Sequence, residues 1–142
     1  MATIVEIKLP ATLGRLAEFM NVVTSSAVSQ GFTPDRISEI ELATEEALVN
    51  IMNYAYEGNS GDLQMIISTD ASGNMRIELI DKGVPFDSTA VAEPDLEAEL
   101  DDRNVGGLGV FFIKQLMDDI TYSRQDDMNI LRYTAYKERP QL

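Results

Sequence analysis

The spacing of apolar positions changes twice in the first third of the chain. Residues 2–9 are rich in Ile and Val and end at Pro10, a pattern that predicts a β-strand. From Thr12 the apolar residues recur with a helical period, and Gly31 supplies a stop. The predicted buried face of this helix is Leu13, Leu16, Met20, Val23 and Ala27.

A second, longer helix is predicted from Thr33, which can cap the first turn, with Pro34 at the first helical position. It runs to about Tyr56, and a turn at residues 58–61 follows it. Apolar residues occur almost all the way round it, at Ile37, Ile40, Leu42, Ala43, Ala47, Leu48, Val49 and Ile51. Because such a helix has little polar surface, we expect it to be mostly buried.

The second half of the chain reads as two pairs of strands separated by a long acidic segment. Residues 62–69 and 74–80 flank a short connection of turn-forming residues, which predicts a hairpin. Residues 87–105 show no apolar period, and a structureless stretch of this length inside a domain typically forms a lid. The elements predicted beyond it are a helix at about 108–118 and strands at 119–125 and 129–137.

This order of elements, β-α-α-β-β-lid-α-β-β, predicts an α+β fold. We expect a two-layer α/β sandwich, with the helices on one face of a mixed, largely antiparallel sheet. At 142 residues the chain has the length of one domain, and neither a linker nor an internal repeat divides it. Residues 1–142 are therefore expected to form a single domain with a lid at about 87–105.

The charge balance and the missing residue types exclude several functions. Lys and Arg total 11 against 24 Asp and Glu, a net charge of −13, which disfavours nucleic acid and anionic membranes as partners. With no Cys and no His, the chain cannot use a thiol nucleophile, a Ser-His-Asp triad or a phosphohistidine, and any metal must be a hard cation held by oxygen. Neither a membrane-spanning apolar stretch nor a signal-peptide core is present, so the expected location is the cytoplasm.

A polar stripe interrupts the long predicted helix. Glu46 and Asn50 are spaced i, i+4 and project from one face, which Asn53 and Glu39 extend. A buried amide left unpaired costs about 1–3 kcal/mol, and an unpaired carboxylate costs more. Something polar must therefore face the stripe: a metal ion, a ligand, or solvent along one wetted edge of the helix.

A second polar segment, Asp81–Asp87, directly follows a predicted strand. An acid at the end of a strand, with Gly83 two residues later, places a carboxylate where the backbone allows a flat ligand to approach. A carboxylate only accepts hydrogen bonds, so it favours an exocyclic amino group such as that of adenine. An ordinary Asp-x-Gly turn would show the same pattern.

The third segment, Asn104–Gly109, places glycines at the start of an apolar helix. Backbone N–H groups at such a helix start converge on an anion, and the helix dipole adds to the attraction. The segment is not a Walker loop, because no Gly-Lys-Ser/Thr follows, and no strand leads straight into it as a dinucleotide fingerprint requires. A flexible hinge is the alternative interpretation.

Together, E-x-x-x-N on a buried helix, D-x-G-x-P-F after a strand and a glycine-rich helix start resemble the ATP-binding domain of the histidine-kinase-like ATPase superfamily, the Bergerat fold. Within it, the chain is similar to the small stand-alone serine-protein kinases that act as anti-sigma factors. The resemblance covers nearly the whole chain: residues 46–56 match the N-box, Asp81–Phe86 the first glycine box and Gly106–Gly109 the second. The family often has His where Tyr54 stands here, a departure that leaves the catalytic pair untouched.

The resemblance implies a role for each matching residue. Asn50 would coordinate Mg²⁺, and Glu46 would be the general base toward the attacking hydroxyl. Asp81 would bind the adenine amino group of ATP, with Gly83 letting the base lie against the chain. The remaining expected ATP contacts are Phe86 at the pocket wall, Arg103 at the β- or γ-phosphate, and the backbone N–H groups of Gly107, Leu108 and Gly109.

The resemblance also implies the partners. It implies phosphoryl transfer from ATP to a Ser or Thr of an anti-sigma-factor antagonist, binding of a sigma factor, and a homodimer. A nucleotide-gated protein-binding module with little or no kinase turnover would also keep Asn50, Asp81 and Gly109, and only a kinase requires Glu46. A Ca²⁺-binding domain built on the acids of residues 93–102 is disfavoured, because that run lacks the ligand spacing and central Gly of an EF-hand.

Overall fold

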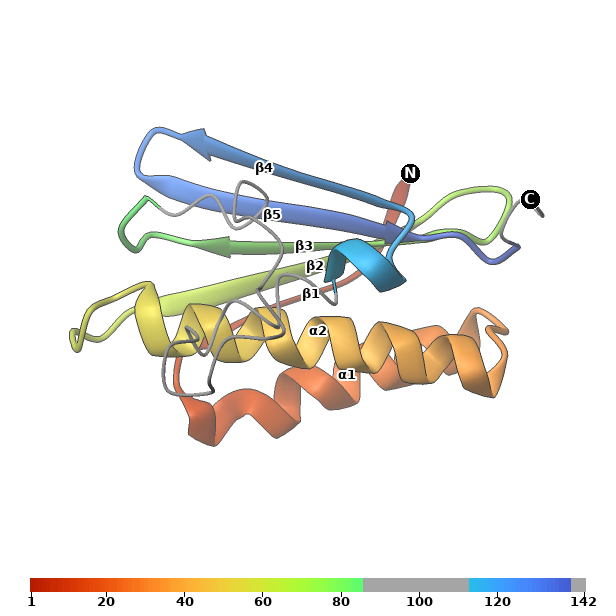
Figure 1. Ribbon diagram of the computed structural model, residues 1–142, viewed down its shortest axis with the longest axis horizontal. Coiled ribbons are helices and arrows are strands. Elements are labelled where there is room, and N and C mark those ends of the chain that lie inside the picture. Colours follow the sequence, from red (N-terminus) through yellow and green to blue (C-terminus); the bar gives the residue numbers. More distant parts are fainter. Residues whose placement is uncertain (86–112, 139–142) are drawn as a thin grey trace, which may run out of the picture.

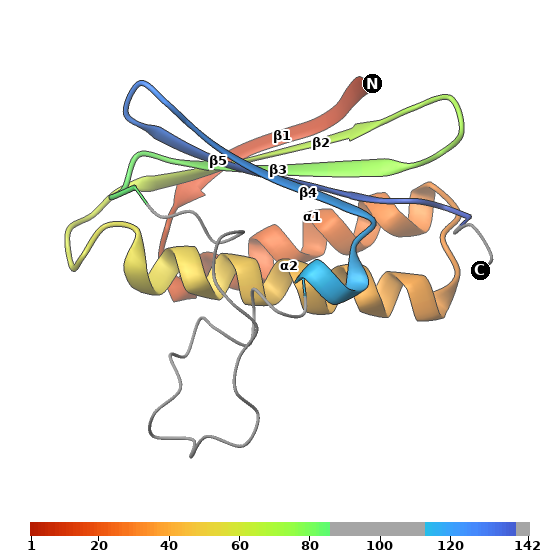
Figure 2. The same ribbon diagram turned by 45° about the horizontal axis from the view of Figure 1, so that its top comes forward.

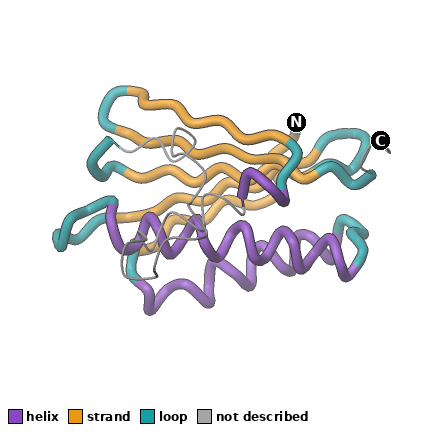
Figure 3. Tube along the Cα trace, in the orientation of Figure 1, coloured by secondary structure: helices purple, strands orange, loops and turns teal. Residues whose placement is uncertain are grey.

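The computed structural model describes residues 1–85 and 113–138, which form two layers. A five-stranded sheet is one layer, and two long helices pack beneath one of its faces as the other (Figures 1 and 2). The α+β, two-layer architecture expected from the sequence is confirmed. In chain order the elements are β1 (Ala2–Pro10), the 3-10 turn η1 (Leu13–Arg15), α1 (Leu16–Ser29), α2 (Pro34–Tyr54), β2 (Asp62–Thr69), β3 (Met75–Asp81), β4 (Asp119–Gln125) and β5 (Met128–Ala135), and residues 113–116 are also helical (Figure 3).

The sheet has the strand order β1-β2-β3-β5-β4. A mixed, largely antiparallel sheet was expected, and all four pairings among the described strands are antiparallel. Because β5 inserts between β3 and β4, residues far apart in the sequence become neighbours at the end of β3. There Asp81 lies directly opposite Asn129.

The helix boundaries agree with the predicted capping signals, with one shift. The Thr33 side chain accepts a hydrogen bond from the Arg36 backbone N–H at 3.2 Å, so the predicted cap of α2 is confirmed. The first helix starts later than Thr12, because residues 13–15 form a 3-10 turn. Leu13, expected on the buried face, lies in that turn and is 55% exposed, whereas Phe19 is fully buried.

The expectation that α2 is mostly buried holds for only part of its surface, because several of its residues are exposed. The sheet covers one side of α2 and α1 packs along another, and no described element packs on the remaining side. On that side Leu42 is 39% exposed. The buried positions of α2 are Arg36, Ile40, Ala43, Thr44, Ala47, Leu48 and Asn50. Two of these, Arg36 and Asn50, carry a guanidinium and an amide group, which need polar partners when buried.

The core lies between the sheet and the two helices. Its largest fully buried side chains are Tyr133, Phe19, Ile40, Leu48, Leu63, Met65, Ile67, Met75, Ile77, Leu79, Ile113 and Val23. The Tyr133 hydroxyl donates to Thr44 Oγ1 at 2.8 Å, which joins β5 to α2 through a satisfied polar pair. Burial raises the pKa of Tyr133 far above its usual value, so this hydroxyl stays protonated. Among the described helices, none combines the length and apolarity needed to cross a membrane.

Candidate functional site

Of the four residues in the predicted polar stripe on α2, two remain candidates for binding a ligand: Glu46 and Asn50. Asn50 is 7% exposed and Glu46 is half-buried one helical turn away. Within residues 1–85 and 113–138, neither side chain has a hydrogen-bond or ion-pair partner. Glu39 is instead paired with Arg36 at 3.3 Å, and Asn53 is exposed. Because a nearly buried amide without a partner is costly, Asn50 is available to a ligand or a metal ion.

Asp81 ends β3 with its side chain toward the helices. It lies on the same face of β3 as Ile77 and Leu79 of the core and is 4% exposed. Its Oδ1 accepts hydrogen bonds from the Gly83 N–H at 2.8 Å and from Asn129 Nδ2 at 2.9 Å. Burial raises the pKa of Asp81 above its usual value, although these two bonds and the charge of Arg124 oppose the shift. Oδ2 makes no hydrogen bond to any described residue and remains a free acceptor.

Three residues of the β4–β5 hairpin hold the Asp81 turn in place. Asn129 Nδ2 also donates to the Val84 carbonyl at 2.8 Å, while its Oδ1 accepts from the Tyr122 hydroxyl at 2.6 Å. Arg124 Nη1 donates to the Gly83 carbonyl at 2.8 Å. Sequence reasoning missed these residues, since polar residues beside a predicted turn carry no signal of a contact with a strand 48 positions away.

Gly83 brings the Asp81 turn against the C-terminal end of α2. A Cβ at Gly83 would lie 2.1 Å from the Ala55 carbonyl oxygen, and the next N–H, that of Val84, donates to that oxygen at 2.8 Å. The described contact that requires glycine is thus with a helix rather than with a ligand. It places the Asp81 turn at the end of α2 that carries Asn50, as the two elements show in Figure 1.

Tyr56 fastens the same turn from another side. Its hydroxyl accepts from the Lys82 N–H at 2.9 Å and donates to the Asp62 carbonyl. Its ring lies against Gly61, where a Cβ would come within 2.1 Å of it. Tyr56 therefore links the end of α2, the start of β2 and the residue that follows Asp81.

A hollow of about 300 Å³ lies near this turn but on the other face of the sheet. Its walls include Lys8, Gln64 and Ile80, which pair across β1, β2 and β3 and alternate with core residues. Tyr56, Asp81 and Lys82 line it as well, so the hollow borders the Asp81 turn.

The other predicted ATP contacts lie outside the described residues. They are Phe86, Arg103, Gly107, Leu108 and Gly109, together with the predicted lid at 87–105. Their roles stay predictions.

The donors beside α2 fit a hard cation. The Asn50 amide oxygen and the Glu46 carboxylate are oxygen ligands of the kind that Mg²⁺ prefers. Within the part of the chain that the structure describes, no group of three or more acidic side chains surrounds a common point. Further ligands of a cation at Asn50 would thus come from a bound molecule, from water or from residues outside the described part; a nucleoside triphosphate supplies such oxygens to Mg²⁺.

The family model of the histidine kinase-like ATPase domain matches residues 9–135. The chain belongs to this family. A relative named serine-protein kinase RsbW, from Bacillus cereus strain AH820, is 29% identical over 142 residues, which cover 97% of this chain and 88% of the relative. The same protein from Bacillus thuringiensis strain Al Hakam is equally similar.

Solved structures support the same fold. The RsbU and RsbW domains of a Mycobacterium tuberculosis protein superpose with a TM-score of 0.66 at 16% identity, covering 96% of this chain. The match spans 34% of the solved chain, about a third of its length. A blue-light activated histidine kinase of Erythrobacter litoralis gives a TM-score of 0.57 at 17% identity, covering 85% of this chain and 41% of that chain.

Family membership gives the Tyr56 contacts a testable consequence for nucleotide binding. In Tyr56→Phe the ring still covers Gly61, but the Lys82 N–H and the Asp62 carbonyl lose their partner. Only the Lys82 bond holds the Asp81 turn, and at about 0.5–1.5 kcal/mol for that bond we expect ATP binding to weaken by about twofold to tenfold. Calorimetric titration with ATP measures this.

Tyr54→Phe is the matched control, because Tyr54 is 45% exposed and its hydroxyl has no hydrogen bond within the described residues. Equal ATP affinities of the Tyr54→Phe and Tyr56→Phe variants would contradict the role assigned to the Tyr56 hydroxyl.

Proposed function

We propose that this protein is an ATP-dependent serine/threonine-protein kinase that acts as an anti-sigma factor in the cytoplasm. The observation that carries the proposal is that Glu46 and Asn50 lie on one face of α2, toward the end that contacts the Asp81 turn. Neither side chain has a hydrogen-bond or ion-pair partner within the described chain. A proton acceptor, a metal ligand and an adenine-specific acceptor thus come from one helix and the turn against it. The relatives named serine-protein kinase support the reaction class.

Each described site residue has a separate task in the proposed reaction. Asp81 Oδ2 would accept a hydrogen bond from the adenine amino group, while Oδ1 stays engaged with Gly83 and Asn129. Asn50 would hold Mg²⁺ through its amide oxygen, and the ion when bound neutralises charge on the phosphates. Glu46 would take the proton of the attacking Ser or Thr hydroxyl.

Five residues outside the described parts would complete the proposed ATP site, four of them by their match to the family motifs. Phe86 would wall the adenine pocket, and Arg103, in the last turn of the predicted lid, would reach the β- or γ-phosphate. Gly107, Leu108 and Gly109 would supply backbone N–H groups to the phosphates.

The proposed partners follow from the resemblance to anti-sigma-factor kinases. The phosphoryl acceptor would be a Ser or Thr on a small anti-sigma-factor antagonist, and a sigma factor would be the sequestered partner. The proposed assembly is a homodimer. The net charge of −13 would complement a basic surface on the sigma factor.

Incubation with Mg²⁺ and γ-labelled ATP, together with candidate antagonist domains from the source cell, tests the proposed reaction. We expect label on a Ser or Thr of one antagonist domain, with the site identified by mass spectrometry. ATP binding without transfer to any antagonist would favour a nucleotide-gated binding module instead. Absence of ATP binding in the presence of Mg²⁺ would overturn both functions.

A further inference from the structure

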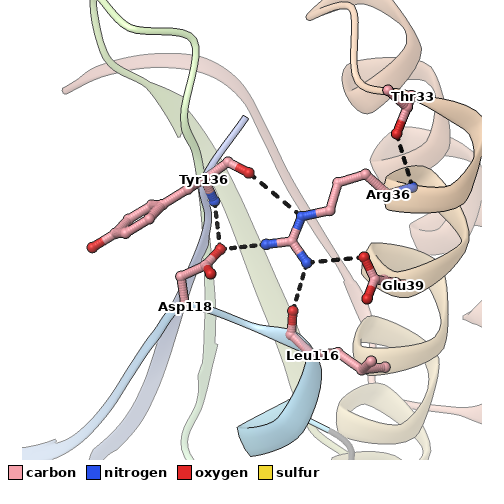
Figure 4. A network of polar contacts seen from close by, with 6 residues as sticks. All are labelled: Thr33, Arg36, Glu39, Leu116, Asp118 and Tyr136. Carbon is pink, nitrogen blue, oxygen red and sulfur yellow. Dashed lines mark hydrogen bonds and ion pairs between the residues drawn. The ribbon is translucent and has the colours of Figure 1, made fainter. Parts of the chain in front are cut away.

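A buried arginine in the first turn of α2 takes no part in the site described above. Arg36 is 6% exposed, and its guanidinium reaches two other segments of the chain, residues 116–118 and Tyr136 (Figure 4). A guanidinium stays charged at any ordinary pH, so burying it requires several well-placed acceptors.

Most hydrogen-bond acceptors around Arg36 belong to the residues just before β4 or just after β5. Nη1 donates to the Leu116 carbonyl at 2.6 Å and to Glu39 at 3.3 Å, and Nε donates to the Tyr136 carbonyl at 3.4 Å. Nη2 donates to Asp118 Oδ2, which also accepts from the Tyr136 N–H at 2.7 Å. Arg36 and Asp118 together therefore join the start of α2, residues 116–118 and the end of β5.

Arg36 and the Asp81 turn lie at opposite ends of α2. At about 1.5 Å per residue, Arg36 and Ala55 lie about 28 Å apart on the helix axis, and Glu46 and Asn50 lie between them. At Ala55 the helix holds Val84, which follows β3. At Arg36 it holds residues 116–118, which precede β4.

The order of proposed roles along α2 runs from the Asp81 turn toward Arg36. The Asp81 turn, which would take adenine, lies at Ala55, followed by the metal ligand Asn50 and then by the base Glu46. The phosphates would therefore extend toward the Arg36 end of α2. Ten residues separate Arg36 from Glu46 on the helix, an axial distance of about 15 Å that is too great for direct contact between Arg36 and the reacting atoms.

We propose that Arg36 is a positioning residue for phosphoryl transfer. It holds the Leu116–Asp118 segment, and with it the helical residues 113–116, against the part of α2 toward which the phosphates would extend. The inference rests on the proposed kinase function. Lysine would not replace arginine here, because a single ammonium cannot address Leu116, Asp118 and Tyr136 in the geometry of the planar fork.

Arg36→Lys tests this by comparing two ligands that share adenine and differ in phosphates. We expect adenosine to bind Arg36→Lys within about twofold of the wild-type affinity, while kcat for phosphoryl transfer falls by about 10- to 100-fold, because small displacements of a positioning group cost that much. ATP affinity should fall relative to adenosine affinity. Circular dichroism and thermal unfolding establish that the measured variant is folded.

Arg15→Lys is the matched control, since Arg15 pairs with Glu18 on the surface, with side chains 46% and 49% exposed. It should leave both ligands and kcat unchanged. If Arg36→Lys does not fold, Asp118→Asn is the second variant, because it keeps the shape of Asp118 and removes its charge. It should lower kcat and ATP affinity relative to adenosine affinity, by a smaller factor than Arg36→Lys.

Two outcomes would overturn the positioning role alone. One is an equal loss of adenosine and ATP affinity, which indicates general disruption of the fold. The other is wild-type kcat and wild-type ligand preference in Arg36→Lys. A wild-type protein that binds adenosine and ATP but transfers no phosphate would instead overturn the proposed kinase function together with this role.

Discussion

Glu46→Gln is expected to lower the rate of phosphoryl transfer by about 10²- to 10⁴-fold while leaving ATP affinity within about twofold of wild type. Glutamine has the size of glutamate but cannot take a proton from the attacking hydroxyl, and loss of a general base typically costs a factor of this size. Glu46 has no hydrogen-bond or ion-pair partner within the described residues, so the change removes no structural contact there. Single-turnover transfer from labelled ATP and calorimetric titration measure the two quantities.

The neighbouring residue provides the control for this experiment. Glu45 is exposed on the outer side of α2, and Glu45→Gln removes the same charge without touching the proposed site. It should transfer phosphate at the wild-type rate. Should Glu46→Gln keep that rate as well, Glu46 is not the base, and the binding-module interpretation becomes the better one.

Asp81→Asn is expected to separate stability from function. The amide oxygen can still accept from Gly83 and Asn129, but the amide nitrogen would take the place of Oδ2 and present a donor to the adenine amino group. Two opposed donors in a buried site leave both unsatisfied, so ATP should bind about 100-fold more weakly or worse. Titration with ATP and with adenosine should show the same loss, because the defect lies at the base.

The stability of the same variant should change in the opposite direction. Burial raises the pKa of Asp81 above its usual value of 3.8, so the native state holds this proton more tightly than the unfolded chain. The contribution of Asp81 to stability therefore declines as the pH rises from about 3.8 through the raised pKa. Since asparagine does not titrate, Asp81→Asn should gain in unfolding free energy relative to wild type between acid and neutral pH.

Urea unfolding at several pH values measures this difference, with Asp127→Asn, an exposed position in the β4–β5 turn, as the control. An Asp81→Asn variant that is less stable than wild type at neutral pH would show that the buried carboxylate stabilises the fold. The interpretation that the Asp81 carboxylate lowers stability in return for adenine recognition would then be wrong.

The sequence predicts the elements of this fold well, because their signals are local. The Thr33–Pro34 start of α2 and the strands 62–69 and 119–125 follow from capping and alternation within a few residues. The burial of each face was harder to predict. Leu42 continues the apolar pattern of α2 yet lies on its outer side, and Leu13 is lost to a 3-10 turn, because tertiary packing decides which side of a helix is covered.

Some residues discussed for the site could likewise be predicted from local sequence patterns, and others could not. Glu46, Asn50 and Asp81 are recognisable because each stands where a short local pattern makes a polar residue unusual. Asn129 and Arg36 are not, since their partners lie 48 and 82 positions away and only the tertiary fold brings them together. From the sequence alone, a buried arginine in the first turn of a helix cannot be distinguished from an exposed one.

The direct pairing of β3 with β5 makes the chain between β3 and β4 an excursion from an already closed framework. Ladder hydrogen bonds join the strands on either side of the excursion, and its two ends rest on one helix. Doubling the length of such an excursion costs only about 0.6 kcal/mol of closure entropy. Descendants of this gene could therefore lengthen, shorten or exchange that stretch while Asp81 keeps its place between Gly83 and Asn129.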